Sequence, residues 1–387
     1  MHSDILIIGG GIVGSAIAYH LARGGRSGDI IVVEPDPTYA LAATPRGNGG
    51  IRQLFSLPEN IAMAQYGLSF FRRFETDMAV DGDPAPIGFR RQGYLFISDR
   101  GGERQMENNF RLQAANGVGA DCLDRDALQA RFPSLRTDDV ALAVHSPDDA
   151  WIDPYAALQG FRRKARSLGV RYLTDAVVDW RGDGHLARRA ILASGATVDA
   201  DIHVLAAGAW SADIGAMIGL ALPVEPMARE THFFRPAAKI EKLPFIKTES
   251  HLAFRPEGGG FAGGLPDWSV SAGWNFDASP DGFEKIVWPA VAHRVPALET
   301  LKLERTWVGH YARNTLDLSA IVGAWTGGFE NVFMAVGFSG HGIMHAPAAG
   351  RALAELILDG GFQTLDLSRF GWSRVPEARP YRERSIV

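Results

Sequence analysis

Three glycines near the N-terminus, Gly9, Gly11 and Gly14, have the spacing of a turn that binds a dinucleotide. The apolar residues 5–8 before them predict a strand, which would lead the backbone into a tight turn at Gly9. Gly11 has no side chain to obstruct a pyrophosphate, and Gly14 would let the following helix pack close to the strand. These residues predict a strand, a turn and a helix around a phosphate-binding site.

The start of that helix and the end of the next strand complete the pattern. Ile12 and Val13 would open the helix, where free backbone amides and the positive end of the helix dipole face the phosphates. A second apolar run, residues 31–33, ends at Glu34, whose carboxylate can accept hydrogen bonds from both ribose hydroxyls. Because an acid there disfavours a 2′-phosphate, we expect FAD or NAD rather than NADP.

Composition restricts the class of protein. The 387 residues are enough for two domains, and 46% hydrophobic with 21% charged residues is typical of a soluble enzyme. A net charge of −5 offers no face for a polyanion, so nucleic acid is not expected as a partner. The single cysteine, Cys122, excludes a disulfide framework and a cysteine-based metal site. No apolar run approaches the length of a membrane span, so the sequence predicts a cytoplasmic protein without one.

The rest of the chain predicts two kinds of sheet. Buried strands are expected at residues 202–205 and 331–336, each followed by a turn of small residues and a helix. Between them, residues 222–308 lack alternating strand and helix units and show short strands, such as 231–234 and 270–274. This pattern favours a mainly antiparallel sheet.

A second stretch, residues 258–263, also matches the glycine spacing of a dinucleotide-binding turn. No long buried strand leads into it, and Gly264 and Pro266 prevent a helix directly after it. We therefore expect a hairpin turn there, which leaves one nucleotide fold and one dinucleotide.

By these motifs the chain resembles the D-amino-acid oxidase (DAO) superfamily of FAD-dependent amine oxidoreductases. The branch it resembles contains sarcosine oxidase, dimethylglycine dehydrogenase and their beta-subunit-like relatives. The stretches that carry the resemblance are residues 9–14 with Glu34, residues 46–52, residues 206–211, residues 311–317 and residues 337–347. They stand in the family's order and span almost the whole chain.

The resemblance implies an α/β fold with two interleaved domains. A Rossmann-like FAD-binding domain of the glutathione-reductase type would be interleaved with an antiparallel-sheet α+β substrate domain. The implied bounds are 1–85, 147–221 and 309–370 for the FAD-binding domain, 86–146 and 222–308 for the substrate domain, and 371–387 for a C-terminal tail that wraps the surface.

The resemblance also implies how FAD is held. The loop at residues 46–52 would run beside the flavin ring, Val177 would lie at the adenine, and amides of the last helix would point at the flavin's N1–C2=O edge. The implied cofactor-binding residues are Gly9, Gly11, Ile12, Val13, Gly14, Glu34, Pro35, Arg46, Gly47, Asn48, Gly49, Gly50, Val177, Ala207, Gly208, Trp210, Gly309, Gly337, Gly340, His341, Gly342 and Ile343.

Some sarcosine oxidases attach FAD through a cysteine two residues before the tyrosine that corresponds to Tyr311. Gly309 stands at that position here, and Cys122 lies elsewhere. The sequence therefore predicts that FAD is bound non-covalently.

Four residues are implied to act on the substrate: Arg52, Tyr311, His341 and Asn275. The planar, charged guanidinium of Arg52 suits a carboxylate, and Tyr311 and His341 would shape the cavity and tune amine protonation. Asn275 stands where a catalytic histidine often lies in the family. The residue types also leave open a structural salt bridge for Arg52 and a core position for Tyr311.

Two lysines of the relatives are missing. Met344 stands where monomeric sarcosine oxidases have a lysine that helps hold the carboxylate, and Ser271 aligns with the lysine that activates oxygen. Because a positive charge helps superoxide form, its loss favours a dehydrogenase over an oxidase. His341 and His345 are four residues apart, but no third ligand is indicated, so no metal site is expected, and His345 is equally well read as a packing residue.

The implied function is oxidation of a secondary amine or an amino acid, whether an N-alkyl or D-amino acid or an imino acid. Hydride would pass from the C–H next to nitrogen to flavin N5, and the imine would hydrolyse. Two alternatives are an FAD-dependent 2-hydroxy-acid dehydrogenase and a non-catalytic flavin-binding subunit of a larger complex. The second alternative would imply a hetero-oligomer partner. The sequence does not identify the electron acceptor that reoxidises the flavin.

Overall fold

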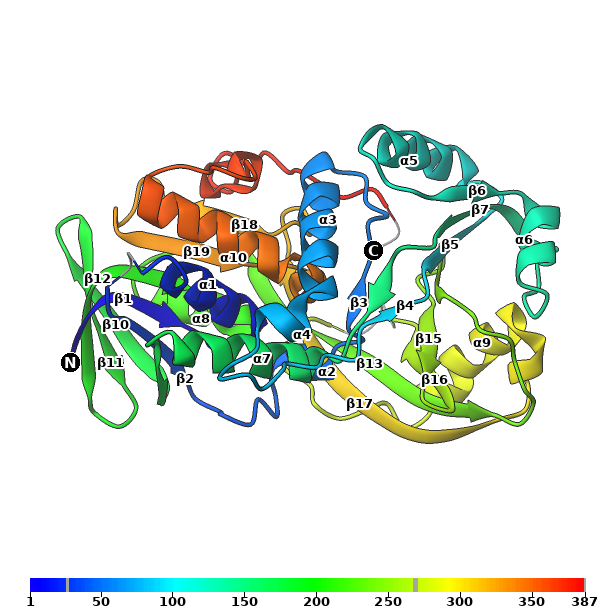
Figure 1. Ribbon diagram of the computed structural model, residues 1–387, viewed down its shortest axis with the longest axis horizontal. Coiled ribbons are helices and arrows are strands. Elements are labelled where there is room, and N and C mark those ends of the chain that lie inside the picture. The colour runs from blue at the N-terminus through cyan, green and yellow to red at the C-terminus, as the bar shows by residue number, and fades with distance from the viewer. Residues whose placement is uncertain (26–27, 267–270, 386–387) are drawn as a thin grey trace.

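The computed structural model describes residues 1–25, 28–266 and 271–385 and places two large sheets side by side along the long axis of the molecule (Figure 1). The first sheet contains the N-terminal strand, and the second lies at the opposite end. The strands of the two sheets come from segments that alternate along the chain.

The first sheet is a parallel sheet with antiparallel additions. Its parallel core has the order β9-β2-β1-β12-β19, while β10, β11 and β18 add antiparallel pairings. The strands are β1 (His2–Ile8), β2 (Ile30–Glu34), β9 (Arg171–Thr174), β10 (Val177–Asp183), β11 (Leu186–Leu192), β12 (Thr197–Leu205), β18 (Ile321–Ala324) and β19 (Val332–Val336). This order confirms the Rossmann-like arrangement and places the glycine turn at the carboxyl end of a central strand.

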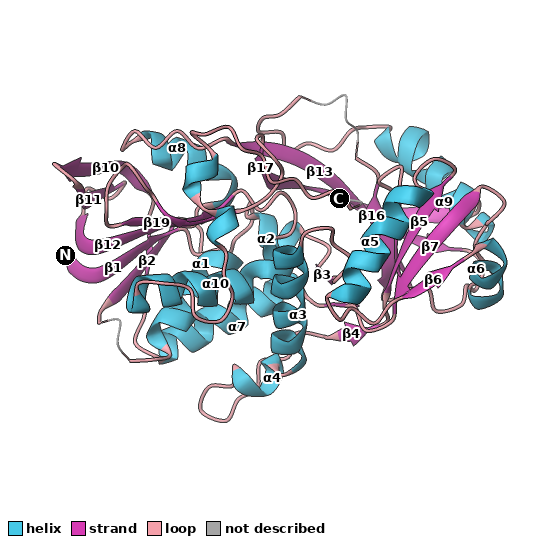
Figure 2. Ribbon diagram, turned by 90° about the horizontal axis from the view of Figure 1, so that it is seen from above, coloured by secondary structure: helices cyan, strands magenta, loops and turns pink. Residues whose placement is uncertain are grey.

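Both faces of this sheet are covered, as the uninterrupted apolar run in β1 requires. Ile5 and Ile7 join the core beneath the helices, whereas Leu6 and Ile8 join a second core on the other face. The helices on the first face are α1 (Ile12–Ala22), α7 (Pro154–Ser167) and α10 (Gly342–Asp359) (Figure 2).

The residue types at its N-terminus explain where α7 begins. Asp153 caps this helix, because its side chain accepts hydrogen bonds from the backbone amides of Tyr155 and Ala156 at 2.9 and 3.0 Å. Pro154 occupies the first turn, where no amide is needed.

The second sheet is antiparallel except at one pairing. Its order is β17-β13-β16-β15-β14-β5-β7-β6, and β14 runs parallel to β5. The strands are β5 (Tyr94–Asp99), β6 (Asp121–Leu123), β7 (Val140–Ser146), β13 (Val224–Pro236), β14 (Phe245–Thr248), β15 (Ala253–Glu257), β16 (Gly260–Gly264) and β17 (Leu301–Asn314). The strand expected at 231–234 is thus only part of the longer β13.

Two other expectations in this region have different outcomes. Residues 258 and 259 form the turn between the antiparallel strands β15 and β16, so the hairpin prediction is confirmed. The strand expected at 270–274 is wrong where it can be judged, since residues 271–274 form no strand and residue 270 lies outside the described residues.

The remaining elements connect and cover the sheets. Three short strands form a third, small sheet in the order β3-β8-β4. The elements are β3 (Gly50–Ile51), β4 (Arg90–Arg91), β8 (Ala150–Trp151), α2 (Ala43–Arg46), α3 (Pro58–Arg72), α4 (Phe74–Asp77), α5 (Glu103–Ala115), α6 (Arg125–Arg131), α8 (Ser211–Ala216) and α9 (Trp288–Arg294). The predicted domain border between 308 and 309 falls inside β17, and the domain bounds stay a prediction.

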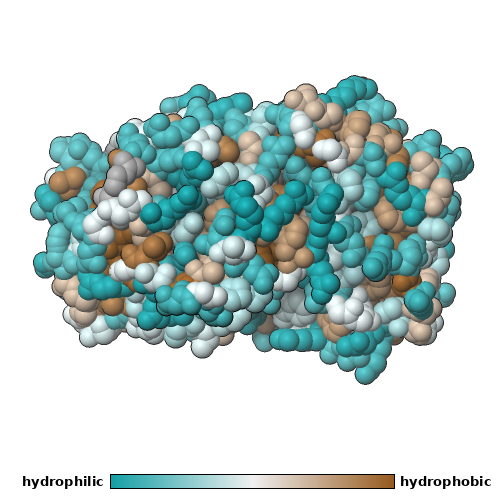
Figure 3. All heavy atoms as spheres, viewed as in Figure 1, coloured by the Kyte–Doolittle hydropathy of each residue, from teal (hydrophilic) through white to brown (hydrophobic). Residues whose placement is uncertain are grey.

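The face shown in Figure 3 carries mainly hydrophilic residues with scattered hydrophobic ones, as is usual for a surface in contact with water. Among the residues that the structure describes, no helix is both long and apolar enough to cross a membrane.

The C-terminal segment is tied into the protein rather than only laid on its surface. The buried guanidinium of Arg374 pairs with the buried carboxylate of Asp317 at 2.8 Å and also donates to the carbonyls of Ser319 and Ala320. Further along, Glu383 accepts hydrogen bonds from Asn60 and the backbone of Ser56. These contacts attach the tail to α3 and to the segment that follows β17.

Breaking this buried pair should destabilise the whole chain. We expect Arg374→Met to lower the free energy of unfolding by about 3–5 kcal/mol, because it leaves the Asp317 carboxylate buried without its cation. Urea unfolding would measure this, with Arg379→Met as a control, since Arg379 pairs with Glu377 on the surface. Equal stability of the two variants would contradict a structural role for Arg374.

Candidate functional site

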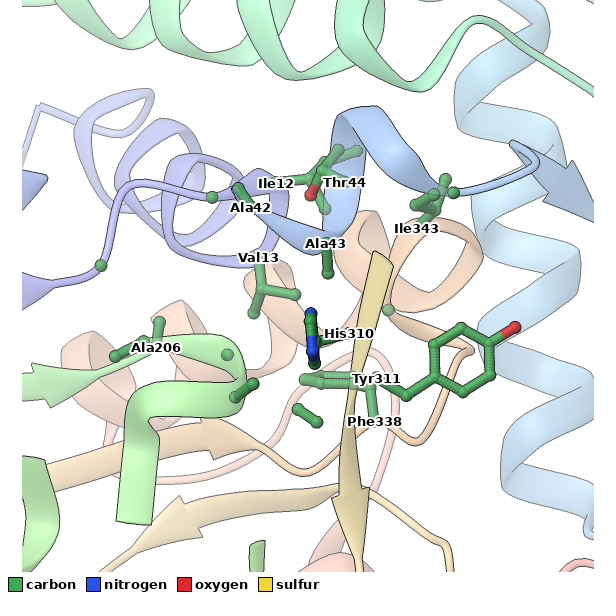
Figure 4. Close-up of a pocket in the computed structure, with 18 of the residues that line it drawn as sticks. Ile12, Val13, Ala42, Ala43, Thr44, Ala206, His310, Tyr311, Phe338 and Ile343 are labelled. Carbon is green, nitrogen blue, oxygen red and sulfur yellow. The ribbon is translucent and has the colours of Figure 1, made fainter. Parts of the chain in front are cut away.

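One cavity of about 620 Å³ lies where the two sheets meet. Figure 4 shows side chains from α1, α2, β17 and the segments around Ala206 and Phe338 facing this cavity. A volume of this size is typical of cofactor and ligand sites.

The glycine turn at the carboxyl end of β1 forms one wall. A Cβ on Gly9, whose φ is +104°, would lie 2.5 Å from the carbonyl oxygen of Ala206, and a Cβ on Gly14 would lie 1.9 Å from the oxygen of Gly9. A Cβ on Gly11 would meet no atom within 4 Å. The protein thus leaves space at the N-terminus of α1, where backbone amides and the helix dipole favour an anion such as a pyrophosphate.

Glu34 lies at one end of the cavity with both carboxylate oxygens engaged. They accept hydrogen bonds from the backbone amides of Gly10 and Asp36 at 2.8 and 3.2 Å. Burial raises the pKa of this carboxyl above its usual value, and the two amides oppose the shift. The oxygens keep lone pairs for ribose hydroxyls.

A second helix N-terminus faces the same cavity. His341 is the N-cap of α10, and Gly342 and Ile343 line the cavity with it. Gly340 has a φ of +96°, and a Cβ there would lie 2.7 Å from the ring of Tyr311. The glycine therefore allows Tyr311 to pack against the turn that leads into α10.

Three buried polar atoms of residues that line the cavity have no hydrogen-bond partner among the described residues: the Tyr39 hydroxyl, Asn48 Oδ1 and His310 Nδ1. Nε2 of His310 accepts a hydrogen bond from the backbone amide of Asn275 at 3.1 Å, so the neutral ring carries its proton on Nδ1. Buried polar groups normally find partners. Together with the open glycine turn, these atoms fit a polar cofactor that would complete their bonding.

Most of the predicted cofactor-binding residues come together here. Those that line the cavity are Gly9, Gly11, Ile12, Val13, Glu34, Pro35, Gly47, Asn48, Gly49, Gly50, Val177, Ala207, Gly208, Trp210, Gly337, Gly340, His341, Gly342 and Ile343. Their individual roles stay predictions.

Gly14, Arg46 and Gly309 do not line the cavity. Gly14 acts through helix packing, as described above. Arg46 does not lie beside the cavity, because its guanidinium donates to the backbone carbonyls of Ala40 and Val308 and so ties the loop to β17. A Cβ on Gly309 would lie 3.0 Å from Cβ of Arg46, so this glycine accommodates the loop rather than the cofactor.

Arg52 lies buried at the other end of the cavity, 2% exposed. Its guanidinium donates to the carbonyl of Leu54 at 2.8 Å, contacts Nε2 of His341 at 3.1 Å and lies over the ring of Phe55 at 4.1 Å. Among the described residues, no carboxylate lies within ion-pair distance of it. The salt-bridge alternative for Arg52 therefore finds no support.

His341 and His345 are both neutral near pH 7. Burial, followed by the charge of Arg52, lowers the pKa of His341 well below its usual value and that of His345 to about 3. Because arginine only donates, Nε2 of His341 is an acceptor and its proton sits on Nδ1. The described residues contain no group of three or more potential metal ligands around this pair.

The other two proposed substrate-side residues differ. Tyr311 lines the cavity and is 37% exposed, so it is not a core tyrosine. Asn275 does not line the cavity: its side chain accepts a hydrogen bond from the backbone amide of Asp277, and it is exposed. The structure gives this residue a contact with the cavity only through its backbone amide, which donates to His310, and its predicted catalytic role stays untested.

Sequence reasoning missed several polar residues that line the cavity, among them Lys247 and His310. A signal in the sequence could have identified Lys247, because this lysine stands within the mainly apolar residues 243–248. It is two positions after Phe245, so both side chains point to the same face of a strand. For His310, the sign was its place directly before Tyr311 in a segment already singled out.

The chain belongs to the DAO family of FAD-dependent oxidoreductases, because the family model for an FAD-dependent oxidoreductase matches residues 4–356. FAD-dependent oxidoreductase domain-containing protein 1 of Xenopus laevis is 37% identical, and the match covers 100% of this chain and 85% of that protein. Rat mitochondrial dimethylglycine dehydrogenase is 26% identical over 95% of this chain, which spans 45% of that longer protein.

A solved structure extends these matches. The L-proline dehydrogenase of P. horikoshii has a TM-score of 0.88 and 26% identity, covering 98% of this chain and 99% of that chain. These likenesses confirm the fold and FAD as the cofactor. The cytoplasmic location stays a prediction, since the dimethylglycine dehydrogenase is described as mitochondrial.

The glycine turn yields a matched pair of variants. Gly11→Ala adds a methyl group that meets no protein atom within 4 Å, so the apoprotein should keep its stability while FAD binds at least tenfold more weakly, about 1.4 kcal/mol. Gly14→Ala should instead lower stability by about 1–3 kcal/mol through its clash with Gly9. Quenching of FAD fluorescence and thermal unfolding separate the two effects; unchanged FAD affinity in Gly11→Ala would place the pyrophosphate elsewhere.

The neutral state of His345 predicts a pH dependence of stability. Its pKa is about 3 when folded against 6.5 as the ordinary value, so the unfolded chain binds the extra proton and stability falls as pH drops from 6.5 toward 3. Between pH 7 and 5 the loss from this residue is about 2 kcal/mol. His345→Leu should show a loss smaller by that amount in urea unfolding. His2→Leu, at an exposed histidine, is the control, and equal pH slopes in wild type and His345→Leu would contradict the burial of a neutral ring.

Proposed function

We propose that this protein oxidises an amine or amino acid that bears a carboxylate, such as an N-alkyl or D-amino acid or an imino acid. The observation that carries the proposal is the buried guanidinium of Arg52 at the end of the FAD cavity, with no carboxylate partner among the described residues. A buried charge without a counter-ion is costly, and a substrate carboxylate would supply one.

The nearby acids do not fill this role. The carboxylate of Asp149 accepts hydrogen bonds from the backbone and side chain of Gln53 at 3.1 and 2.8 Å, and burial raises its pKa to about 7. Glu383 is engaged by the backbone of Ser56 and by Asn60. Arg52 is thus left free to bind an anion that enters the cavity.

The residues that would hold FAD are the glycine turn with the N-terminus of α1 for the pyrophosphate, Glu34 for the ribose, and the N-terminus of α10 for the ring. When bound, FAD supplies a hydride acceptor for the carbon next to nitrogen. We propose that it is held non-covalently, since Gly309 offers no thiol and Cys122 lies exposed on β6.

The chain's own residues then act mainly by position. Arg52 binds the carboxylate and so fixes the amine end of the substrate relative to the cavity wall. Arg52 donates through one terminal nitrogen to the carbonyl of Leu54 and through the other to His341, which is neutral and so adds no charge that would repel a protonated amine. Tyr311 closes the wall beside Gly340, and its hydroxyl is a candidate partner for the amine proton.

The relatives favour amines over hydroxy acids, since matched proteins are described as a 4-methylaminobutanoate oxidase, a dimethylglycine dehydrogenase and an L-proline dehydrogenase. The choice of electron acceptor is less constrained. Ser271, from which a dehydrogenase was expected, is exposed and does not line the cavity, whereas Lys247 does. Reoxidation of the reduced protein by oxygen, compared with a dye acceptor, decides this point.

The proposed function can be tested directly by mixing the oxidised, FAD-bound protein with candidate substrates in the absence of oxygen. A panel of N-methyl amino acids, D-amino acids and L-proline should bleach the flavin's visible absorbance for at least one member. Bleaching by 2-hydroxy acids alone would favour the hydroxy-acid dehydrogenase. A protein that binds FAD, stays oxidised with every compound and co-purifies with a partner would favour the non-catalytic subunit.

Arg52 provides a residue-level prediction. Arg52→Met should raise KM for a carboxylate-bearing amine at least tenfold, about 1.4 kcal/mol, because the substrate loses its charged partner. Steady-state kinetics would measure this, with Arg90→Met on the exposed strand β4 as a control. An unchanged KM would remove Arg52 from the substrate site.

A further inference from the structure

A second basic side chain, Lys247, lies in the same cavity as Arg52 and has no part in the function argued so far. It belongs to β14, where Phe245 and Lys247 line the cavity while Ile246 and Thr248 are buried away from it. The alternation of the strand therefore aims the lysine into the cavity.

The pairing of β14 with β5 brings Lys247 close to Arg52. In this parallel register Lys247 lies beside Phe96. The guanidinium of Arg52 lies over the ring of the same Phe96, 5.2 Å from its centre. Two cationic side chains from segments far apart in the chain thus approach one part of the cavity.

The charges of Arg52 and Lys247 also affect the pKa values of their neighbours. Burial, followed by the charge of Arg52, lowers the pKa of the Lys247 amine well below its usual value, and Lys247 in turn contributes to the lowered pKa of His341. Among the described residues, no carboxylate forms an ion pair with either Lys247 or Arg52. Glu383 and Asp149 act on Arg52 only from beyond ion-pair distance, so the cavity side of both basic groups is open to an anion.

We propose that Lys247 and Arg52 bind one substrate carboxylate from two sides, so that Lys247 determines which amines the enzyme accepts. The inference rests on the proposed function and narrows its substrate class to amines in which a carboxylate reaches both cations. Amines without a carboxylate would leave Arg52 without a counter-ion and Lys247 without an acceptor for its hydrogen bonds, and would be rejected.

The carboxylate also resolves the repulsion between the two cations. An anion placed between them stabilises the protonated form of Lys247, which Arg52 and burial otherwise disfavour. Each oxygen can then accept a charge-assisted hydrogen bond, one from the guanidinium and one from the ammonium.

The experiment uses acetate as the probe and acetamide as its uncharged analogue. Acetate is titrated into the oxidised holoenzyme, and binding is followed by the change in the flavin's visible spectrum. We expect wild type to bind acetate and not acetamide, and Lys247→Met to weaken acetate binding at least tenfold. Lys302→Met, at an exposed lysine of the same sheet, should change it less than twofold.

Acetate affinity of Lys247→Met within twofold of wild type would overturn the proposal. If this variant does not retain FAD, the same titration is made with Lys247→Gln, which keeps a hydrogen-bond donor and removes the charge. A crystal structure of wild type with acetate is an independent test. Acetate oxygens within about 3 Å of both Lys247 and Arg52 are expected, and contact with Arg52 alone would count against the inference.

These results separate this inference from the proposed function, since the titration needs no turnover. Lysine-dependent acetate binding in a protein that oxidises no amine would leave the carboxylate site standing and remove the function. Oxidation of an N-methyl amino acid with an unchanged KM in Lys247→Met would do the opposite.

Discussion

The close crossing of backbone at the end of β1 is the constraint on which the rest of the structure depends. Gly9 passes so near Ala206, and Gly14 so near Gly9, that a single added Cβ would lie 2.5 or 1.9 Å from a carbonyl oxygen. Because only residues 9–11 separate β1 from α1, the helix begins directly at the cavity. Gly350 then lets α10 pack against α1, with its Cβ position 2.9 Å from the backbone of Ala16. Two helix N-termini thereby face the same space.

Acidic and basic side chains line the same cavity. Glu34, Asp36 and Asp175 are its acids, which favour hydroxyl groups and repel phosphates. Arg52 and Lys247 are its bases, which favour an anion. The N-termini of α1 and α10 also face the cavity and favour a pyrophosphate. In the proposed binding mode, the ribose of the dinucleotide would lie at Glu34 and its reactive end near the two bases.

Features that depend on neighbouring residues could be read from the sequence. The glycine turn, the Asp153 cap, the turn between β15 and β16 and the start of α10 all follow from residue types within a few positions of one another. For the same reason most of the residues predicted to bind the cofactor do line the cavity, since they stand in turns at strand ends. The burial of the C-terminal segment was not, because Arg374 meets Asp317 only through a contact across 57 positions.

The placement of Lys247 in the cavity could not be predicted from the sequence, because it depends on the register between strands that are distant in the chain. Lys247 faces the cavity because β14 pairs in parallel with β5, which sets residues 245–248 against residues 94–97. A shift of one residue would bury the lysine and turn Ile246 into the cavity. Ser271 and Met344 suggested a cavity without an amine, yet the fold supplies one from a different strand. The charge at a site is therefore set by which elements meet there, and a missing residue at one aligned position does not establish that its charge is missing.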